Sequence, residues 1–319
     1  MKAFLGIDVG SLSAKMALLD DNKKLLSYVY LPTQGNPIAA LQRGLEQLEQ
    51  RLPEDVDIRG VAATGSARQL VGAIVGADYI KNEITSQSVA ALHLVPGVRT
   101  VIEIGGQDSK IIIMRDGVVV DFAMNTICAA GTGSFLDHQA QRLNVSTEQF
   151  SCMAAESDTP VEISGKCTVF TESDMIHKQQ TGHRTEDIAY GLCRTLVRNY
   201  LSNVGLGKHI DSPIVFQGGV AFNNGIIRAF REELGVDIIV PEHHEITGAI
   251  GAAILAGEEM ESEASCFKGF AICHQEYSTS SFECRECHQL CQIARLRFNG
   301  QTIYSWGGHC DLFQQAVKA

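Results

Sequence analysis

The sequence predicts an α/β protein built from two related lobes and a cysteine-rich extension. Short apolar segments alternate with helical patterns, which is typical of α/β folds. A strand-turn-strand pattern near the start returns after residue 98, and six of the ten cysteines lie beyond residue 265. At about 150 residues per domain, 319 residues are enough for roughly two domains. We place the predicted boundaries at 1–97, 98–260 and 261–319.

The predicted elements follow from apolar runs and turn signals. Three short apolar runs bounded by glycine and Asp-Asp-Asn predict a meander of strands at 2–9, 16–19 and 24–31. Leu41, Leu45 and Leu48 have helical spacing within 37–51. A buried strand is predicted at 61–65, with helices at 67–75, 82–94, 169–180 and 222–233.

Composition excludes several classes of protein. Hydrophobic residues make up 45% and charged residues 20%, which excludes a disordered or collagen-like chain. The formal net charge of −11 argues against a nucleic-acid partner, because nonspecific binding to nucleic acid needs a positive footprint. No apolar run reaches the roughly 18 residues of a membrane span, so we expect no membrane partner and a cytoplasmic location. In a reducing cytosol, ten cysteines indicate metal, cluster or redox chemistry.

The internal repeat predicts a nucleotide site. Without a gap, the alignment places Asp8 on Glu103, Gly10 on Gly105, Ser11 on Gly106, Ser13 on Asp108 and Lys15 on Lys110. Glycine turns present N–H groups to anions, and carboxylates near phosphates require a divalent cation. Two such loops predict a nucleoside triphosphate with Mg²⁺ in a cleft between related halves. The alternative is that each loop is a tight β-turn.

A third glycine cluster follows another apolar strand. Gln217-Gly218-Gly219 precedes the helical pattern at 222–233, which is consistent with an adenosine pocket. The neighbouring His243-His244 pair is interpreted as a solvated loop. Gly248 then begins a helix of small residues that permits close packing.

Two cysteines lie at predicted helix starts. Cys128 and Cys167 each precede a helical pattern, where the helix dipole favours a thiolate and a negatively charged cluster. An iron–sulfur cubane needs about four thiolates, and a two-fold dimer would supply two from each subunit. The alternative is that both are buried free cysteines. Cys152 and Cys193, within helical patterns, are interpreted as core residues.

The extension carries a second cysteine pattern. Cys284-x2-Cys287-x3-Cys291 with Cys310 predicts a closed four-thiolate site for zinc or for a second [4Fe–4S] cluster. His288, His309 and Cys273 are possible substitutes as ligands.

Five ordered motifs carry a family resemblance. They are Gly6-Ile7-Asp8-Val9-Gly10-Ser11, Glu103-Ile104-Gly105-Gly106-Gln107-Asp108-Ser109-Lys110, Cys128-Ala129-Ala130-Gly131-Thr132-Gly133-Ser134-Phe135, Cys167-Thr168-Val169-Phe170 and Gln217-Gly218-Gly219-Val220-Ala221. Over about residues 1–257 the chain resembles the 2-hydroxyacyl-CoA dehydratase activators and the ATP-binding subunits of benzoyl-CoA reductases (the BadF/BadG/BcrA/BcrD type). The resemblance implies two ribonuclease-H-like lobes of the actin, Hsp70 and sugar-kinase fold with ATP between them. It also implies a homodimer that shares one [4Fe–4S] cluster through Cys128 and Cys167.

The implied activity is ATP-driven electron transfer. ATP binding and hydrolysis would be coupled to the transfer of one low-potential electron to a 2-hydroxyacyl-CoA dehydratase or related double-cluster reductase, with ferredoxin or flavodoxin as electron donor. Asp8, Glu103 and Asp108 would organise Mg²⁺ and water, and Gln107 would orient the attacking water. The implied nucleotide-binding residues are Gly10, Ser11, Ser13, Lys15, Gly105, Gly106, Lys110, Gly131, Gly133, Gln217, Gly218, Gly219, Asn223 and Gly248.

Two other functions compete with this hypothesis. A small-molecule kinase of the same fold would not need Cys128 or Cys167. A nucleotide-dependent scaffold would bind ATP without hydrolysing it. The segment beyond about Ala264 is absent from short activators and resembles part of longer, fused activator-like proteins.

Overall fold

The computed structural model describes residues 1–53, 55–165, 167–259 and 264–313. Its contacts divide the chain into two compact units, Met1–Ser86 with Gly248–Ala319 and Gln87–Thr247. These divisions differ from the predicted boundaries, because the chain after residue 247 returns to the first unit. The three predicted domains therefore stay a prediction.

The first unit is built on a five-stranded sheet in the order β3-β2-β1-β4-β5. Its strands are β1 (Lys2–Val9), β2 (Ser13–Asp20), β3 (Leu25–Pro32), β4 (Asp57–Thr64) and β5 (Tyr79–Ile80). The helices are α1 (Pro37–Glu49), α2 (Arg68–Val75) and α9 (Thr247–Glu259), and α3 (Glu83–Leu94) runs across the division between the units. The first three strands form the predicted meander, and β4 adds parallel to β1.

The second unit repeats this sheet. Its order is β10-β9-β6-β7-β8; read from β8, this is the order of the first sheet with β6, β7, β8, β9 and β10 in place of β1, β2, β3, β4 and β5. The strands are β6 (Thr100–Ile104), β7 (Ser109–Arg115), β8 (Val118–Asn125), β9 (Ile214–Gln217) and β10 (Ile238–Ile239). The helices are α4 (Gly133–Arg142), α5 (Thr147–Ala155), α6 (Thr168–Gln180), α7 (Thr185–Asn203) and α8 (Asn224–Leu234). The repeat inferred from five sequence offsets is therefore a repeat of topology.

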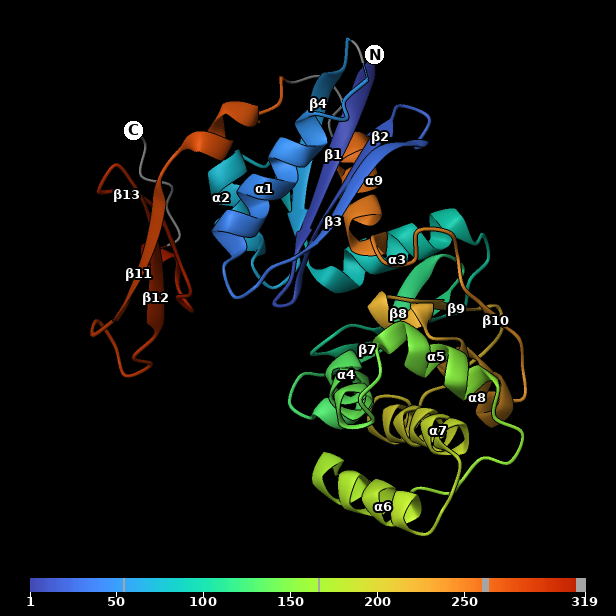
Figure 1. Ribbon diagram of the computed structural model, residues 1–319. Helices are drawn as coiled ribbons and strands as arrows, with labels where there is room; N and C mark the ends of the chain where they lie inside the picture. Colours follow the sequence, from blue (N-terminus) through green and yellow to red (C-terminus); the bar gives the residue numbers. More distant parts are fainter. Residues whose placement is uncertain (54, 166, 260–263, 314–319) are drawn as a thin grey trace. The chain divides into compact units, whose positions relative to one another are not determined.

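Helices cover both faces of the first sheet. Neighbouring residues of a strand point to opposite faces, so β1 packs against helices on each side. Leu5 and Ile7 of β1 share a buried cluster with Leu41 and Leu45 of α1. Gly6 points the other way, where an added Cβ would lie 1.9 Å from the Ala249 carbonyl oxygen of α9. Figure 1 shows α1 and α2 on one face of this sheet and α9 on the other.

The core of the second unit lies between its sheet and the helices α4, α5, α7 and α8. Ile102 and Phe216 of the central strands pack with Phe135, Leu196 and Phe230 from these helices. The Phe230 ring makes edge contacts with Phe216 and with Tyr200.

The extension folds as a three-stranded antiparallel sheet that the sequence analysis did not predict. Its strands are β11 (Tyr277–Glu283), β12 (Gln292–Phe298) and β13 (Gln301–Trp306). Ile272 and Leu296 join the core cluster formed by α1 and α2. The Tyr304 hydroxyl donates to Gln69 Oε1 of α2 at 2.8 Å. The extension thus gains stability by packing on the first unit.

Within the described ranges, no helix is long and apolar enough to cross a membrane.

We expect Gly6→Ala to destabilise the first unit severely. Its methyl group would overlap backbone atoms of α9, which cannot move as a side-chain tip can. Overpacking of this kind costs about 3 kcal/mol. Urea unfolding measures the loss, and Gly257→Ala is the matched control, since its Cβ would meet the Phe4 ring at 3.3 Å or more. Equal stability of the two variants would contradict the close approach of β1 and α9.

Candidate functional site

The first strand-end loop joins an acid, a glycine and a lysine. Asp8 near the end of β1 lies opposite Lys15 of β2, and Lys15 Nζ is 3.2 Å from Asp8 Oδ2. The N–H of Gly10 donates to the Ser13 carbonyl at 2.9 Å, which closes the turn. Ser11 is exposed at its tip. The loop therefore presents a hydroxyl and backbone beside a paired carboxylate.

The second loop has the same construction with one more acid. Glu103 lies opposite Lys110, whose Nζ is 2.9 Å from Glu103 Oε2 and 2.8 Å from Asp108 Oδ2. The N–H of Gly105 donates to the Asp108 carbonyl at 3.0 Å. Lys110 is only 2% exposed, and a buried ammonium requires such pairing. The register of both strand pairs confirms the alignment of the repeat, while Gln107 is exposed in the loop.

A glycine turn follows the adjacent strand in each unit. Gly65 has φ +92° and Gly218 has φ +93°. A Cβ at Gly65 would lie 2.6 Å from Asp8 Oδ1, and one at Gly218 would lie 3.1 Å from Glu103 Oε1. A side chain is excluded at Gly65 by Asp8 itself and at Gly218 by the Ile104 carbonyl oxygen, which a Cβ would approach to 2.5 Å, so both turns require glycine. Gly218 was predicted; Gly65 was missed, although it too directly follows an apolar strand.

The Gln217 and His244 side chains are engaged within the second unit. Gln217 Nε2 donates to Gln87 Oε1 of α3 at 2.6 Å. His244 is buried, contrary to the predicted solvated loop; its Nδ1 lies 3.1 Å from the Gly218 carbonyl oxygen and its ring packs on Phe222. His244 therefore secures the glycine turn.

Residues around Gly133 brace the second loop. The N–H groups of Gly133 and Ser134 donate to the carbonyls of Gly105 and Gly106, at 2.9 and 2.8 Å. A Cβ at Gly133 would meet Val220 Cγ2 at 3.0 Å. Gly131 is buried one turn earlier. These two predicted glycines thus lie where they position the loop.

A cavity of about 510 Å³ opens beside Gly219. Phe222, Asn223, Asp137 and Cys152 are among its lining residues. Asn223 also caps α8, since its Oδ1 accepts the Ile226 N–H at 3.1 Å. A cavity of this size accommodates a nucleoside. Gly248, by contrast, is buried in α9 of the first unit.

The two interior cysteines have different environments. Cys193 is fully buried, as predicted, and burial raises the pKa of its thiol well above the ordinary value. The prediction that Cys152 is a core residue is wrong, because its side chain is exposed. Position 152 lies on the side of α5 that faces the cavity.

Cys128 precedes a short 3-10 turn, Ala129–Gly131, that leads into α4. Asn125 fixes its backbone: Asn125 Oδ1 accepts the Cys128 N–H at 3.1 Å, and Nδ2 donates to the Cys128 carbonyl at 2.8 Å. The thiol makes no capping hydrogen bond. The backbone of this half-buried cysteine is thus fixed, while its thiol does not cap the helical turn.

Cys167 occupies the N-cap of α6 and is exposed. The segment before it is fastened to α7, because the Ile163 carbonyl accepts from Thr195 Oγ1 at 2.9 Å and the Gly165 carbonyl accepts from Asn199 Nδ2 at 2.9 Å. Asp187 accepts from the Ser157 hydroxyl at 2.7 Å. These contacts fasten residues 157–165, part of which is buried, to α7.

Apolar side chains surround both cysteine turns on the surface. Ile127 is 97% exposed, and Val169 and Phe170 are 66% and 71% exposed. Strand β8, at the edge of the second sheet, exposes Val118, Val120, Phe122 and Met124. Exposed apolar patches of this kind mark interaction surfaces.

The extension brings Cys284 and Cys291 together at the end of the β11–β12 hairpin. The Cys284 N–H donates to the Cys291 carbonyl at 2.8 Å, and a Cβ at Gly307 would lie 2.5 Å from the Gln292 carbonyl oxygen. Among the described residues, however, no three His, Cys, Asp or Glu side chains gather as a metal-holding group. The predicted site of Cys284, Cys287, Cys291 and Cys310 is therefore not confirmed.

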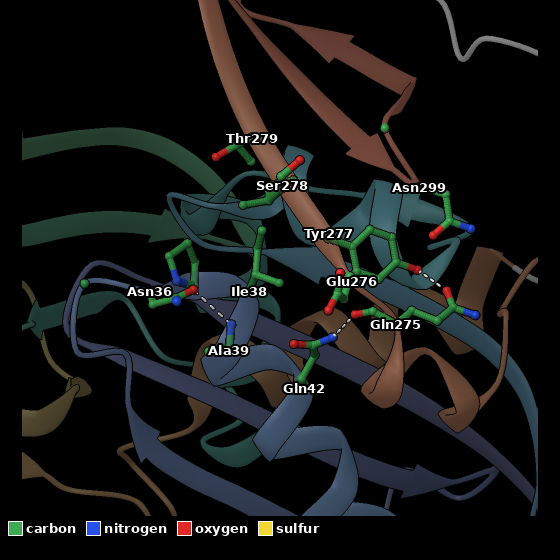
Figure 2. Close-up of a pocket in the computed structure, with 14 residues that line it drawn as sticks. Asn36, Ile38, Ala39, Gln42, Gln275, Glu276, Tyr277, Ser278, Thr279 and Asn299 are labelled. Carbon is green, nitrogen blue, oxygen red and sulfur yellow. Dashed lines mark hydrogen bonds between the residues drawn. The ribbon is translucent and has the colours of Figure 1, made fainter.

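A second cavity, of about 690 Å³, lies where the extension meets α1. Figure 2 shows two of its hydrogen bonds: Gln42 Nε2 donates to the Gln275 backbone carbonyl at 2.7 Å, and the Tyr277 hydroxyl donates to Gln275 Oε1 at 2.6 Å. The first of these hydrogen bonds connects α1 to the segment that leads into β11.

Comparisons with known proteins agree with this geometry. The sequence profile of the BadF/BadG/BcrA/BcrD ATPase family matches residues 5–256. The chain is 36% identical over 254 residues to the (R)-2-hydroxyglutaryl-CoA dehydratase activating ATPase of Acidaminococcus fermentans, covering 79% of this chain and 96% of that one. It is 34% identical over 258 residues to the 2-hydroxyisocaproyl-CoA dehydratase activator of Clostridioides difficile, covering 80% and 95%.

Solved structures show the fold. The activator of 2-hydroxyisocaproyl-CoA dehydratase from Clostridium difficile with bound ADPNP superposes with a TM-score of 0.74 at 33% identity, covering 81% of this chain and 95% of that one. The fold is thus the actin, Hsp70 and sugar-kinase type, as predicted. The matched range ends before β11, so the extension lies outside it.

We expect Gly165→Ala to disturb the segment before Cys167. Gly165 has φ +155°, and its added Cβ would lie 1.8 Å from Thr171 Oγ1. The loss, about 3 kcal/mol, is measured by urea unfolding. Thr171→Ala in the same chain should restore part of it, since it removes the overlapping oxygen. Gly182→Ala, at φ +83° with open space around it, controls for backbone strain. Strictly additive losses would contradict the contact.

We expect Asp137→Asn to stabilise the protein increasingly as pH rises. Burial raises the pKa of Asp137, so folding favours its protonated form. That contribution is complete below the unfolded pKa of about 3.9 and is lost as pH rises through the folded pKa. The gain in unfolding free energy should therefore be greater at pH 7 than at pH 4. Glu148→Gln, in the same cavity, should show the opposite sign, because a hydrogen bond from Ser146 lowers the Glu148 pKa.

Proposed function

Because this chain belongs to the BadF/BadG/BcrA/BcrD ATPase family and is an ATP-hydrolysing enzyme, we propose that it activates a partner protein by ATP-driven electron transfer. The partner would be a 2-hydroxyacyl-CoA dehydratase or a related double-cluster reductase, and the donor a ferredoxin or flavodoxin. The observation that carries the proposal is the joint presence of two strand-end loops and two helix-start cysteines. The relatives named above are activators of such dehydratases.

The nucleotide is proposed to bind through the loops of both units. The proposed contacts are Gly10, Ser11, Ser13 and Lys15 in the first unit and Gly105, Gly106 and Lys110 in the second, with the Gly10 and Gly105 N–H groups closing the turns. The cavity beside Gly219 suits the nucleoside. Each group lies in a loop at a strand end, a place where proteins commonly present backbone N–H groups to phosphate oxygens.

Magnesium fits the acidic side chains of these loops. Carboxylate oxygens are the ligands that Mg²⁺ prefers, and Asp8, Glu103 and Asp108 are the proposed ones. The bound ion would neutralise phosphate charge. Gln107, exposed in the second loop, is proposed to orient the attacking water.

Cys128 and Cys167 fit half of a [4Fe–4S] site. Both cysteines begin helical segments, whose free N–H groups favour an anionic cluster. Two copies of the chain would complete four thiolates, and the exposed apolar patch around the cysteines supports a homodimer. A bound cluster would supply one-electron redox chemistry. The chain's own part is to hold the thiolates through Asn125, Thr195 and Asn199.

The extension remains a proposed second metal site, for zinc or another cluster. The pairing of Cys284 with Cys291 across the hairpin supports it.

We expect Cys128→Ser and Cys167→Ser each to lose iron while still binding ATP. Anaerobically reconstituted wild type should hold about two irons per chain as a dimer. Iron, sulfide and solution mass measure this directly, and nucleotide binding checks the fold. Cys152→Ser should keep its iron, because Cys152 lines the cavity beside Gly219 and is not a proposed cluster ligand. Full iron content in both helix-start variants would refute the cluster ligands and favour a kinase.

A further inference from the structure

The two duplicated loops carry opposite net charge. Equivalent positions are Asp8 and Glu103, Ser13 and Asp108, Lys15 and Lys110, and, three residues beyond the two glycine turns, Arg68 and Ala221. With ordinary ionisation the first set sums to one positive charge and the second to one negative charge. The difference arises from Arg68 and Asp108. Of the two sets, the first is therefore the more favourable for phosphate anions.

Arg68 is placed against the first loop by the glycine turn. Its Nη1 donates to the Gly65 carbonyl at 3.2 Å. Gly65 in turn passes against Asp8, and the Ala67 N–H donates to the Val9 carbonyl at 3.0 Å. Two backbone contacts thus tie the start of α2 to the end of β1. The guanidinium therefore contacts the same glycine turn that passes Asp8, within one unit.

The Arg68 guanidinium has more N–H donors than its one hydrogen bond to Gly65 uses. It is half-buried, and within the described part of the chain no carboxylate pairs with it. Arg198, another half-exposed arginine, contacts both Glu162 and Glu233. Arginine carries five N–H donors in a planar fork that matches a phosphate, and one carbonyl engages only part of it.

We propose that Arg68 binds the terminal phosphate of bound nucleotide and thereby distinguishes ATP from ADP. The inference rests on the proposed nucleotide binding by the first loop. The terminal phosphate is the charge by which ATP exceeds ADP, so a cation that contacts it favours the triphosphate selectively. Gly65 then has two roles: its backbone lies close to the Asp8 carboxylate, and its carbonyl oxygen positions Arg68.

The test is calorimetric titration of the full chain with a non-hydrolysable ATP analogue and with ADP, both with Mg²⁺. Arg68→Gln should weaken the analogue about tenfold or more, as expected for loss of a charge-assisted bond, and ADP about threefold or less. Arg43→Gln is the matched control, because Arg43 also donates to one backbone carbonyl, that of Pro32, and is exposed on α1. It should leave both affinities unchanged.

Further variants keep the outcomes distinct. Arg68→Lys keeps the charge but loses the fork, and should weaken the analogue by an intermediate factor. Emission of Trp306, the single tryptophan, reports that the first unit is folded. Equal weakening of both nucleotides, or no weakening, overturns the role of Arg68. Failure of the wild type to bind either nucleotide would instead overturn the proposed function.

Discussion

The lysine–carboxylate pair across the first two strands of each sheet is the interaction on which the two loops depend. Lys110 can be buried only because Glu103 and Asp108 lie within 3 Å of its ammonium. Strand side chains alternate between faces, so a shift of one residue would turn Lys110 away from both acids. The pair therefore fixes the register, and the register fixes the Gly105–Asp108 turn. Asp8 and Lys15 impose the same constraint in the first unit.

Backbone close approach then makes these loops rigid. The turns at Gly65 and Gly218 pass so close to Asp8 and to the Ile104 carbonyl, respectively, that a side chain at either position would overlap them. The loop at Gly105 and Gly106 is also held from the start of α4. Preorganised donors of this kind bind phosphate without a large ordering cost. In the first unit, α2 carries this arrangement further, because Gln69, next to Arg68, accepts the hydrogen bond from Tyr304 of the extension.

Packing determines which cysteines are accessible to a ligand and which are part of the core. Cys193 lies inside the α7 core, where burial keeps its thiol protonated. Cys128 and Cys167 lie at the surface, on backbone that Asn125, Thr195 and Asn199 hold still. Exposure gives them access to a ligand, and the fixed backbone gives them a defined position. Neither property follows from being a cysteine.

The sequence by itself determined the strand meander, the repeat and the residues of the two loops, because alternation and glycine spacing are local signals. It also placed Cys128 and Cys167 at helix starts. It could not determine the long-range contacts. Tertiary structure decided that Cys152 is exposed, that His244 secures a turn and that Gly65 matches Gly218.

The extension marks the same limit. Its three strands are short and polar, and their apolar residues become buried by packing against the core that contains α1 and α2. Likewise, the chain after residue 247 rejoins the first unit because α9 packs on the face of β1 that Gly6 leaves open. Local patterns predict which elements form; which surfaces they bury depends on partners far away in the chain, and no local pattern records those.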